Sequence, residues 1–344
     1  MKISLKSFLV TSAAALAVVA TPPTVAQAQD SEPIQVALAD LPEVETLFFL
    51  VGLARAQEKG LEAEVTFFNG EELAIQAILS GQADLGLGSP YSVIQRSPVP
   101  VRLFYQVSKI IFFPVVNASI ESWQDMEGVS IATQQRGGPL EALANLMSEQ
   151  EGVQLGEFQY VPGSESRVVA LTQGHIEAAL IDLLNKNMIL EQNPDGFRVL
   201  PWTDKVVTDE ALFARVDWIE ANEDKAKLLI GEMLQAAQDI CENPSIIAEE
   251  RERLDLLPDL PDELADQLAD YYTEAIAANV YSCDGGSAEA AQTDIEILAS
   301  AGQLQGTEEE LQVEDFWYLE PLREVRAEMG LPEGEAGTEP PSGN

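Results

Sequence analysis

Short apolar runs along the first part of the chain follow two spacings in turn, one typical of strands and one typical of helices. Residues 34–38 alternate as a strand does, and residues 47–59 carry apolar side chains on a helical period that ends at Gly60. A second strand at 65–68 and a second helix at 71–80 follow. Because strand and helix take turns, the pattern predicts a parallel sheet with helices on both faces.

The same unit of helix, glycine turn and strand occurs twice, at residues 74–88 and at residues 168–182. In each unit a glycine, Gly81 or Gly174, stands between an apolar helix end and a short apolar strand. Glycine has no Cβ, so it adopts the left-handed conformation that ends a helix. Two such units predict two similar α/β lobes, with a ligand bound in the groove between them.

Alternation continues through the middle of the chain and then gives way to helices. Further strands are predicted at 85–88, 101–107, 129–133, 158–161 and 178–181, with a return crossing at 209–216. Helices are predicted at 140–151, 168–173, 224–240, 262–280, 294–301 and 316–329.

The two ends of the chain differ from its middle. Two lysines precede an apolar run at 8–20, and residues 26–28 fit the small-x-small cleavage pattern, so residues 1–28 are predicted to be a signal peptide. No cysteine stands at the cleavage point, and no later run reaches about 18 apolar residues. We therefore expect an exported, soluble protein without a lipid anchor. The tail at 331–344, rich in Gly, Pro, Glu and Ser, is expected to be disordered.

Acidic residues dominate the composition. The chain has 19 Lys and Arg against 58 Asp and Glu, which gives a formal net charge of −39. Repulsion from phosphate argues against nucleic acid as a partner and against anionic membrane surfaces. The acids are spread along the whole chain, which favours a hydrated, salt-adapted (halophilic) surface over an acidic binding patch. The excess charge is therefore expected to reflect habitat and not ligand.

Candidate catalytic and metal-binding residues are few. Cys241 and Cys283 are the two cysteines, and an oxidising exported setting favours one structural disulfide between them. With His175 as the single histidine, the sequence offers no plausible zinc set, no Ser/His/Asp triad and no Gly-Lys-Ser/Thr phosphate loop. His175 is expected in a solvent-facing turn, and Arg167 is expected to pair with nearby carboxylates. The sequence thus predicts no enzyme, no metal and no cofactor.

Three segments resemble an exported substrate-binding protein of an ABC importer. Residues 53–65 are similar to the first helix and second strand of the branch that holds aliphatic-sulfonate, taurine, nitrate and thiamine-pyrimidine binding proteins, the SsuA/THI5-like family. Residues 122–132 resemble the start of that family's second lobe, and residues 213–244 resemble its returning strand and long helix. The likeness spans most of the mature chain and rests on the order of these motifs.

This resemblance implies an α/β fold of the two-lobed, type II periplasmic-binding-protein kind, each lobe a mostly parallel sheet flanked by helices. Lobe 1 would comprise residues 30–114 with 212–330, and lobe 2 residues 115–211. The family's mechanism implies a periplasmic monomer that closes on a small-molecule ligand and then docks to a membrane ABC permease. A sensory protein that presents its ligand to a receptor remains an alternative. A thiamine-pyrimidine synthase-like enzyme is disfavoured by the signal peptide and by the absence of a cysteine cluster.

Ligands of such folds bind beyond the carboxyl ends of strands, and the sequence offers candidates there, each with a structural alternative. At 89–91, a hydroxyl, a helix N-terminus and an aromatic face converge, although Ser89 could serve only as the helix cap before Pro90. At 136–138, two glycines let amides approach an anion that Arg136 would clamp, although such a loop is also common on surfaces.

Asp182 could accept a hydrogen bond from an amine or cap the next helix, and the loop at 40–45 could be an ordinary strand-to-helix turn. Glu43 and Glu45 favour a cationic ligand, Arg136 favours an anion, and both together would suit a zwitterion. We expect a small nitrogen- or sulfur-containing organic solute of the sulfonate, taurine, nitrate or pyrimidine class. The predicted ligand-binding residues are Leu41, Pro42, Glu43, Ser89, Pro90, Tyr91, Ser108, Arg136, Gly137, Gly138, Asp182 and Asn185.

Overall fold

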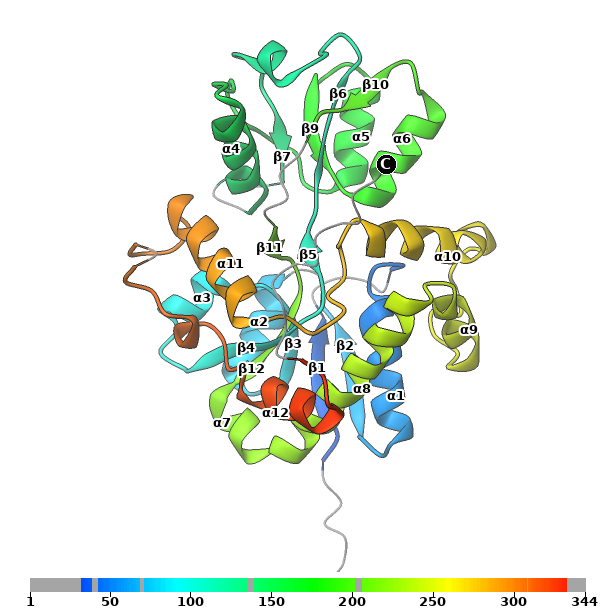
Figure 1. The fold of residues 1–344 in the computed structure, drawn as a ribbon, viewed down its shortest axis with the longest axis vertical. Coiled ribbons are helices and arrows are strands. Elements are labelled where there is room, and N and C mark those ends of the chain that lie inside the picture. The colour runs from blue at the N-terminus through cyan, green and yellow to red at the C-terminus, as the bar shows by residue number, and fades with distance from the viewer. Residues whose placement is uncertain are drawn as a thin grey trace, which may run out of the picture. The chain divides into compact units, whose positions relative to one another are not determined.

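Two five-stranded sheets organise the chain in the computed structural model (Figure 1), which describes residues 32–38, 43–68, 71–134, 136, 139–201, 206–307 and 309–332. The first sheet has the order β2-β1-β3-β12-β4. Its strands are β1 (Ile34–Leu38), β2 (Ala63–Phe67), β3 (Leu85–Gly88), β4 (Val101–Gln106) and β12 (Ala211–Arg215). Strand β1 runs parallel to β2 and β3, and β12 runs antiparallel to β3 and β4.

Helices flank the first sheet on both sides (Figure 1). They are α1 (Leu47–Glu58), α2 (Glu71–Ser80), α3 (Tyr91–Arg96), α7 (Val216–Ala221), α8 (Glu223–Glu242), α9 (Ile246–Arg253), α10 (Asp262–Ala277), α11 (Ala288–Ser300) and α12 (Glu320–Met329). Helix α1 packs closely on α8. The close approach depends on Gly52, since a Cβ at this position would lie 2.2 Å from the sulfur of Met233. Arg55 of α1 adds ion pairs of 2.5 Å to Asp239 and 3.1 Å to Glu250.

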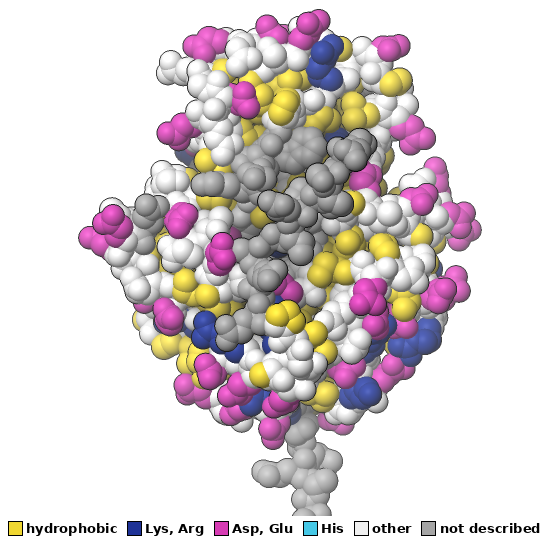
Figure 2. All heavy atoms as spheres, in the orientation of Figure 1, with side chains coloured by type: hydrophobic (Ala, Val, Ile, Leu, Met, Phe, Trp, Pro, Cys, Tyr) yellow, Lys and Arg dark blue, Asp and Glu magenta, His cyan; other side chains and the backbone are white. Residues whose placement is uncertain are grey.

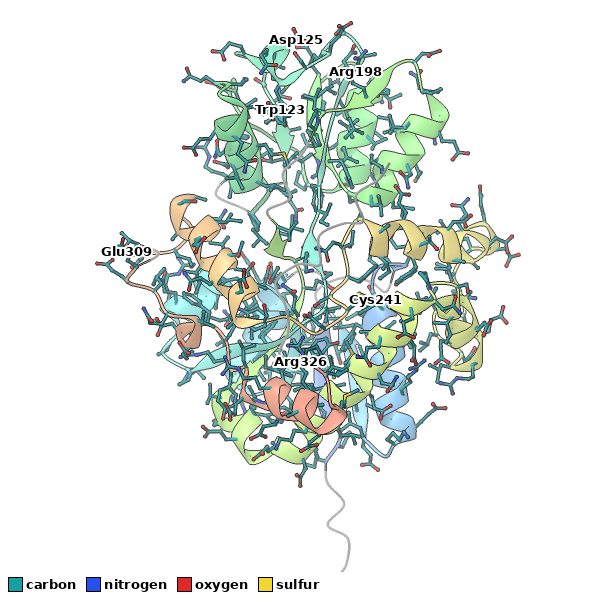
Figure 3. All side chains as sticks on the ribbon, in the orientation of Figure 1. Trp123, Asp125, Arg198, Cys241, Glu309 and Arg326 are labelled. Atoms are coloured by element: carbon teal, nitrogen blue, oxygen red, sulfur yellow. A yellow bond between two sulfur atoms is a disulfide. The ribbon has the colours of Figure 1, made fainter. Side chains whose placement is uncertain are left out.

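The second sheet has the order β10-β6-β9-β7-β8. Its strands are β6 (Phe113–Asn117), β7 (Ala132–Thr133), β8 (Gln159–Tyr160), β9 (Ala178–Ile181) and β10 (Phe197–Val199), with helices α4 (Pro139–Glu151), α5 (Ser164–Thr172) and α6 (Leu183–Gln192). Strand β7 is parallel to β8 and β9, and β6 is antiparallel to β9 and β10. Figure 3 places Trp123, Asp125 and Arg198 in this part of the chain, at the end away from the first sheet. Trp123 is buried and donates to the Pro201 carbonyl at 2.7 Å.

Two short strands carry the chain between the sheets. Strand β5 (Lys109–Ile110) leads from β4 toward β6, and β11 (Val207–Thr208) leads back toward β12. They pair antiparallel, with Val207 opposite Ile110 (Figure 1). The predicted α/β fold, with two sheets and two crossings, is confirmed at the level of architecture.

Both predicted glycine turns are confirmed, since Gly81 and Gly174 have φ of +74° and +71°. Several predicted boundaries shift. Strand β7 covers only the last two residues of the predicted 129–133, and α11 begins well before the predicted 294, where the Ser287 side chain caps it. Helix α12 begins after the predicted 316 because the backbone of residues 316–318 pairs with Leu103 of β4.

The two cysteines form a disulfide in the structure. Cys241 in the last turn of α8 is bonded to Cys283, which follows α10, with Cα atoms 6.0 Å apart (Cys241 is labelled in Figure 3). Helices α9 and α10 lie within the loop that this bond closes. The disulfide therefore ties the end of α8 to the segment that leads into α11.

Acidic side chains are spread over the face shown in Figure 2, with far fewer Lys and Arg side chains among them. Within the described ranges, no helix is long and apolar enough to cross a membrane. The predicted signal peptide at 1–28 lies outside the described residues, as does the predicted tail apart from Leu331 and Pro332.

Candidate functional site

A cavity of about 990 Å³ lies where the first sheet, the second sheet and the crossings meet. Its first-sheet wall includes the segment from Gly88 to Tyr91, which follows β3, and its second-sheet wall includes Gln134 and Leu140. Residues of both crossings, among them Ile110 and Thr208, complete it. A cavity of this size suits a small organic ligand.

Ser89 and Pro90 line this cavity, but the predicted cap at Ser89 is wrong. The amide of Tyr91 donates to the Ser89 carbonyl at 2.8 Å, so the chain makes a tight turn before the helix begins. Pro90 is consequently the residue that precedes α3. Its side chain has no hydrogen-bond acceptor, so it cannot cap the helix. Ser89 is left half-buried at the cavity wall.

Tyr91 also borders the cavity, but its hydroxyl belongs to a buried network. That hydroxyl donates to the Asp294 carboxylate of α11 and accepts from the Trp317 indole at 2.7 Å. The ring is only 3% exposed, so it offers a ligand little aromatic face. The ring packs against Phe316 at 5.5 Å, and a ligand role for Tyr91 stays a prediction.

Asp294 connects α11 to the second crossing. Its oxygens accept from the Thr208 amide at 2.8 Å and the Thr208 hydroxyl at 2.6 Å. Burial raises the pKa of Asp294 to about 6, against the opposing effect of the hydrogen bonds from Thr208 and Tyr91. Asp294 thus fixes two cavity-lining residues, Tyr91 and Thr208.

Asp182 lies at the end of β9 and caps α6. Its Oδ1 accepts from the Asn185 amide at 2.8 Å, and the Asn185 side chain donates to both carboxylate oxygens at 3.2 and 3.0 Å. Asn185 is buried in this role. The capping alternative is therefore present in the structure, and a ligand role for either residue stays a prediction.

Among the residues that the structure describes, Arg167 forms no ion pair with a carboxylate, so the prediction that it pairs with nearby acids is wrong. Its guanidinium donates to the carbonyls of Leu180 at 2.7 Å and Val161 at 2.9 Å and to the Ser164 hydroxyl at 2.8 Å. The side chain is buried where α5 packs on β9, and the carboxylates of Asp182 and Glu165 act on it only through their charge. This burial lowers the pKa of Arg167. His175 is exposed, as predicted.

The remaining predicted residues are dispersed. The exposed Arg136 guanidinium lies 5.3 Å from the centre of the Tyr160 ring, and Glu43 is exposed. Ser108 is buried between the crossings, where its amide donates to the Glu210 carbonyl at 3.0 Å. Four predicted residues lie outside the described ranges: Leu41, Pro42, Gly137 and Gly138.

Sequence reasoning missed a tyrosine cluster around Glu45, in the turn that leads into α1. Tyr271 of α10 donates to the Glu45 carboxylate at 3.5 Å, Tyr272 donates to the Val44 carbonyl at 2.8 Å, and Tyr281 donates to the Glu45 carbonyl at 3.3 Å. The three tyrosines come from a part of the chain more than 200 residues away from this turn. Helical periodicity marks Tyr271 and Tyr272 only as core residues.

Helices α6 and α10 also meet beside this cluster. Lys186 of α6 forms an ion pair of 2.8 Å with Glu274 of α10, and Asn187 donates to the same carboxylate. The Lys186 ammonium also lies 4.4 Å from the centre of the Phe113 ring. Glu274 thus joins the helices of the two sheets on this side.

The sequence of the chain matches a known family. The sequence model described as NMT1/THI5 like matches residues 57–247, which is more than half of the chain. The chain belongs to the NMT1/THI5-like family. This finding confirms the resemblance inferred from the sequence. Among curated proteins, none matches the chain in sequence.

Solved structures share this family member's fold. The periplasmic aliphatic sulphonate binding protein SsuA of Escherichia coli is 16% identical, with a TM-score of 0.61, 91% of this chain covered and 97% of that one. The periplasmic nitrate-binding protein NrtA of Synechocystis is 14% identical, with a TM-score of 0.61 and coverages of 87% and 89%. The alkanesulfonate-binding protein SsuA of Xanthomonas axonopodis, bound to MOPS, is 15% identical, with a TM-score of 0.58 and coverages of 80% and 94%. All three neighbours are described as binding proteins. At such identities the likeness shows the periplasmic-binding-protein fold.

Among the residues that the structure describes, no group of three or more His, Cys, Asp or Glu side chains could hold a metal ion.

Proposed function

We propose that this protein is an exported solute-binding protein that captures a small nitrogen- or sulfur-containing organic solute and delivers it to an ABC importer. The observation that carries the proposal is the cavity of about 990 Å³, whose walls come from both sheets and both crossings. A site built this way is completed or opened by movement of the crossings, as ligand capture by lobe closure requires.

The proposal assigns residues 30–114 with 212–330 to one lobe and residues 115–211 to the other. Family membership and the sulfonate- and nitrate-binding neighbours support it. Of the predicted ligand-binding residues, Ser89 and Pro90 are the best supported, because they line the cavity at the end of β3. Export to the periplasm rests on the predicted signal peptide.

A thermal-shift screen tests the binding function. We expect at least one compound among sulfonates, amino sulfonates, nitrate, pyrimidines and thiamine to raise Tm by several degrees, because a ligand at a hundred times its Kd stabilises by about 2.7 kcal/mol. The same compounds are assayed for turnover. Catalytic conversion of a compound that causes no stabilisation would overturn the binding-protein proposal in favour of an enzyme.

Substitution of Ser89 by phenylalanine tests the place of the site. The ring would fill the cavity from its first-sheet wall, so we expect S89F to weaken binding of the compound found in the screen by about tenfold or more, measured by calorimetry. The matched control is S80F, because Ser80 is exposed at the opposite end of α2 from the cavity-lining Glu71. Equal affinity of S89F and S80F would exclude this cavity wall as the site.

A further inference from the structure

The Glu45 carboxylate is a second candidate contact for a ligand held between the sheets, and it is not one of the residues that line the cavity of about 990 Å³. Glu45 lies in the segment after β1, and Ser89 lies directly after β3. These two strands are parallel, and Leu38 pairs with Leu87, so both strands end at the same edge of the sheet. The negative charge of Asp182, at the end of β9 in the second sheet, acts on Glu45. Glu45 therefore lies on the side of the first sheet that faces the second.

One oxygen of this carboxylate, Oε2, is buried without a hydrogen-bond donor in the part of the chain that the structure describes. Among the described residues, none donates to Oε2, which has lost its contact with solvent. The Tyr271 hydroxyl approaches Oε1 only at 3.5 Å, the outer limit of a hydrogen bond. A buried acceptor left in this state is costly, and a charged one more so.

Aromatic rings form a rigid wall behind the carboxylate. Tyr281 is stacked between Phe48 at 4.5 Å and Tyr272 at 5.0 Å, and Tyr271 meets Tyr272 edge to face at 5.3 Å. These rings exclude water from one side of Glu45 and hold its backbone in place through the tyrosine hydroxyls. In such a low-dielectric corner, an ion pair is stronger than in water.

Basic side chains of the second sheet's helices are engaged elsewhere. Lys186 is paired with Glu274, and Arg167 donates to two carbonyls and a hydroxyl. The ionisable groups that act on Glu45 include the carboxylates of Asp182 and Glu43 and the phenols of Tyr271, Tyr272 and Tyr281. The charges around Glu45 therefore favour a cation from outside the chain.

We propose that Glu45, backed by Tyr271 and Tyr281, is the group that recognises a protonated amine on the transported solute. This inference rests on the proposed function and narrows its ligand to amine-bearing compounds. An ammonium group would bring the N–H donor that Oε2 lacks and a positive charge to the carboxylates. An anion without an amine would meet only like charge at this position.

Ionisation of Glu45 gives the proposal a pH signature. Burial, reinforced by the charges of Asp182 and Glu43, raises the pKa of Glu45 to about 7, although hydrogen bonds from its own backbone and Tyr271 oppose the change. An amine should bind the ionised form. Since the ionised fraction rises from roughly a tenth at pH 6 to roughly nine-tenths at pH 8, affinity should rise about tenfold over that range.

The test is calorimetry with two matched pairs of probes: 2-aminoethanesulfonate against ethanesulfonate, and benzylamine against benzyl alcohol. We expect an amine to bind at least about tenfold more tightly than its partner, with the rise from pH 6 to pH 8. E45Q should abolish both the preference and the pH dependence. The control E62Q removes an exposed carboxylate next to β2 and should behave as wild type.

Each contrary outcome has its own meaning. Tighter binding of the amine-free partners, or a flat pH profile in the wild-type protein, would overturn the amine inference and leave the binding function standing. Even if E45Q does not fold, the pH dependence of binding to the wild-type protein tests the amine inference. Failure of these probes and of the whole thermal-shift screen to bind would reject the binding function itself, and the amine inference with it.

Discussion

Replacement of both Cys241 and Cys283 by serine is expected to lower the free energy of unfolding by about 4 kcal/mol. The disulfide spans a sequence separation of 42 residues, and the loop-closure entropy of a cross-link of this length predicts a loss of that size. In a protein of this length, the loss corresponds to a fall in Tm on the order of 10 °C. Scanning calorimetry of the double variant measures it.

A functional consequence should accompany the loss of stability. The closed loop contains α10 and therefore Tyr271 and Tyr272, which hold the turn at Glu45. Arg326, labelled in Figure 3, still anchors the segment after Cys283 through Asp284 at 2.9 Å and the Gly286 carbonyl at 3.0 Å. We therefore expect a folded variant with weakened ligand binding.

Reducing agent supplies the control for this prediction. Dithiothreitol should lower the Tm of the wild-type protein toward that of the double serine variant and leave the variant unchanged. A variant as stable as the oxidised wild type would show that other contacts, such as those of Arg326, already restrict this loop.

Short-range patterns were enough to predict the architecture. Strand β1 coincides with the predicted 34–38, and the turns at Gly81 and Gly174 have the predicted left-handed backbone. These features depend on alternation, helical period and the missing Cβ of glycine, which neighbouring residues determine. The crossing strands β5 and β11 were missed, because each has two residues and is defined only by its distant partner.

Site residues were harder to predict because tertiary contacts decide their roles. Tyr91 follows a strand, as a ligand-binding residue would, but Asp294 and Trp317 from the C-terminal half engage its hydroxyl. Arg167 stands among acidic neighbours in sequence, yet packing on β9 directs it to carbonyls. Glu45 was noted as an acid in the first loop, but its burial depends on tyrosines that no local pattern relates to it.

Substitution of Asp294 by alanine is expected to destabilise the protein by about 3 kcal/mol at pH 7. Three donors would lose their acceptor: the amide and hydroxyl of Thr208 and the hydroxyl of Tyr91. Each buried group left unsatisfied costs about 1 kcal/mol or more. D266N and D266A are matched controls, because Asp266 is an exposed aspartate of α10, and both should stay within about 0.5 kcal/mol of wild type.

The pH dependence separates the charge of Asp294 from its hydrogen bonds. Since its pKa rises from the ordinary value of 3.8 to about 6 on folding, the folded protein holds this proton more tightly than the unfolded chain does. The stabilisation from that proton is complete below about pH 4 and is lost as the pH rises through 6, a change of about 3 kcal/mol. D294N cannot titrate. The stability of wild type minus that of D294N should therefore fall by most of this amount between pH 4 and pH 7.

Denaturant unfolding of both proteins at several pH values measures this difference. The same difference at pH 4 and pH 7 would mean that Asp294 keeps an ordinary pKa and that its site is better solvated than the structure indicates. The expected fall would show that this protein keeps a carboxylate in its core at neutral pH at a cost in stability. Because Asp294 holds Tyr91 and Thr208 at the cavity wall, D294A should also weaken ligand binding, whereas D266A should not. If D294A loses stability but keeps full affinity for the ligand, Asp294 stabilises the crossing strand without determining the shape of the binding site.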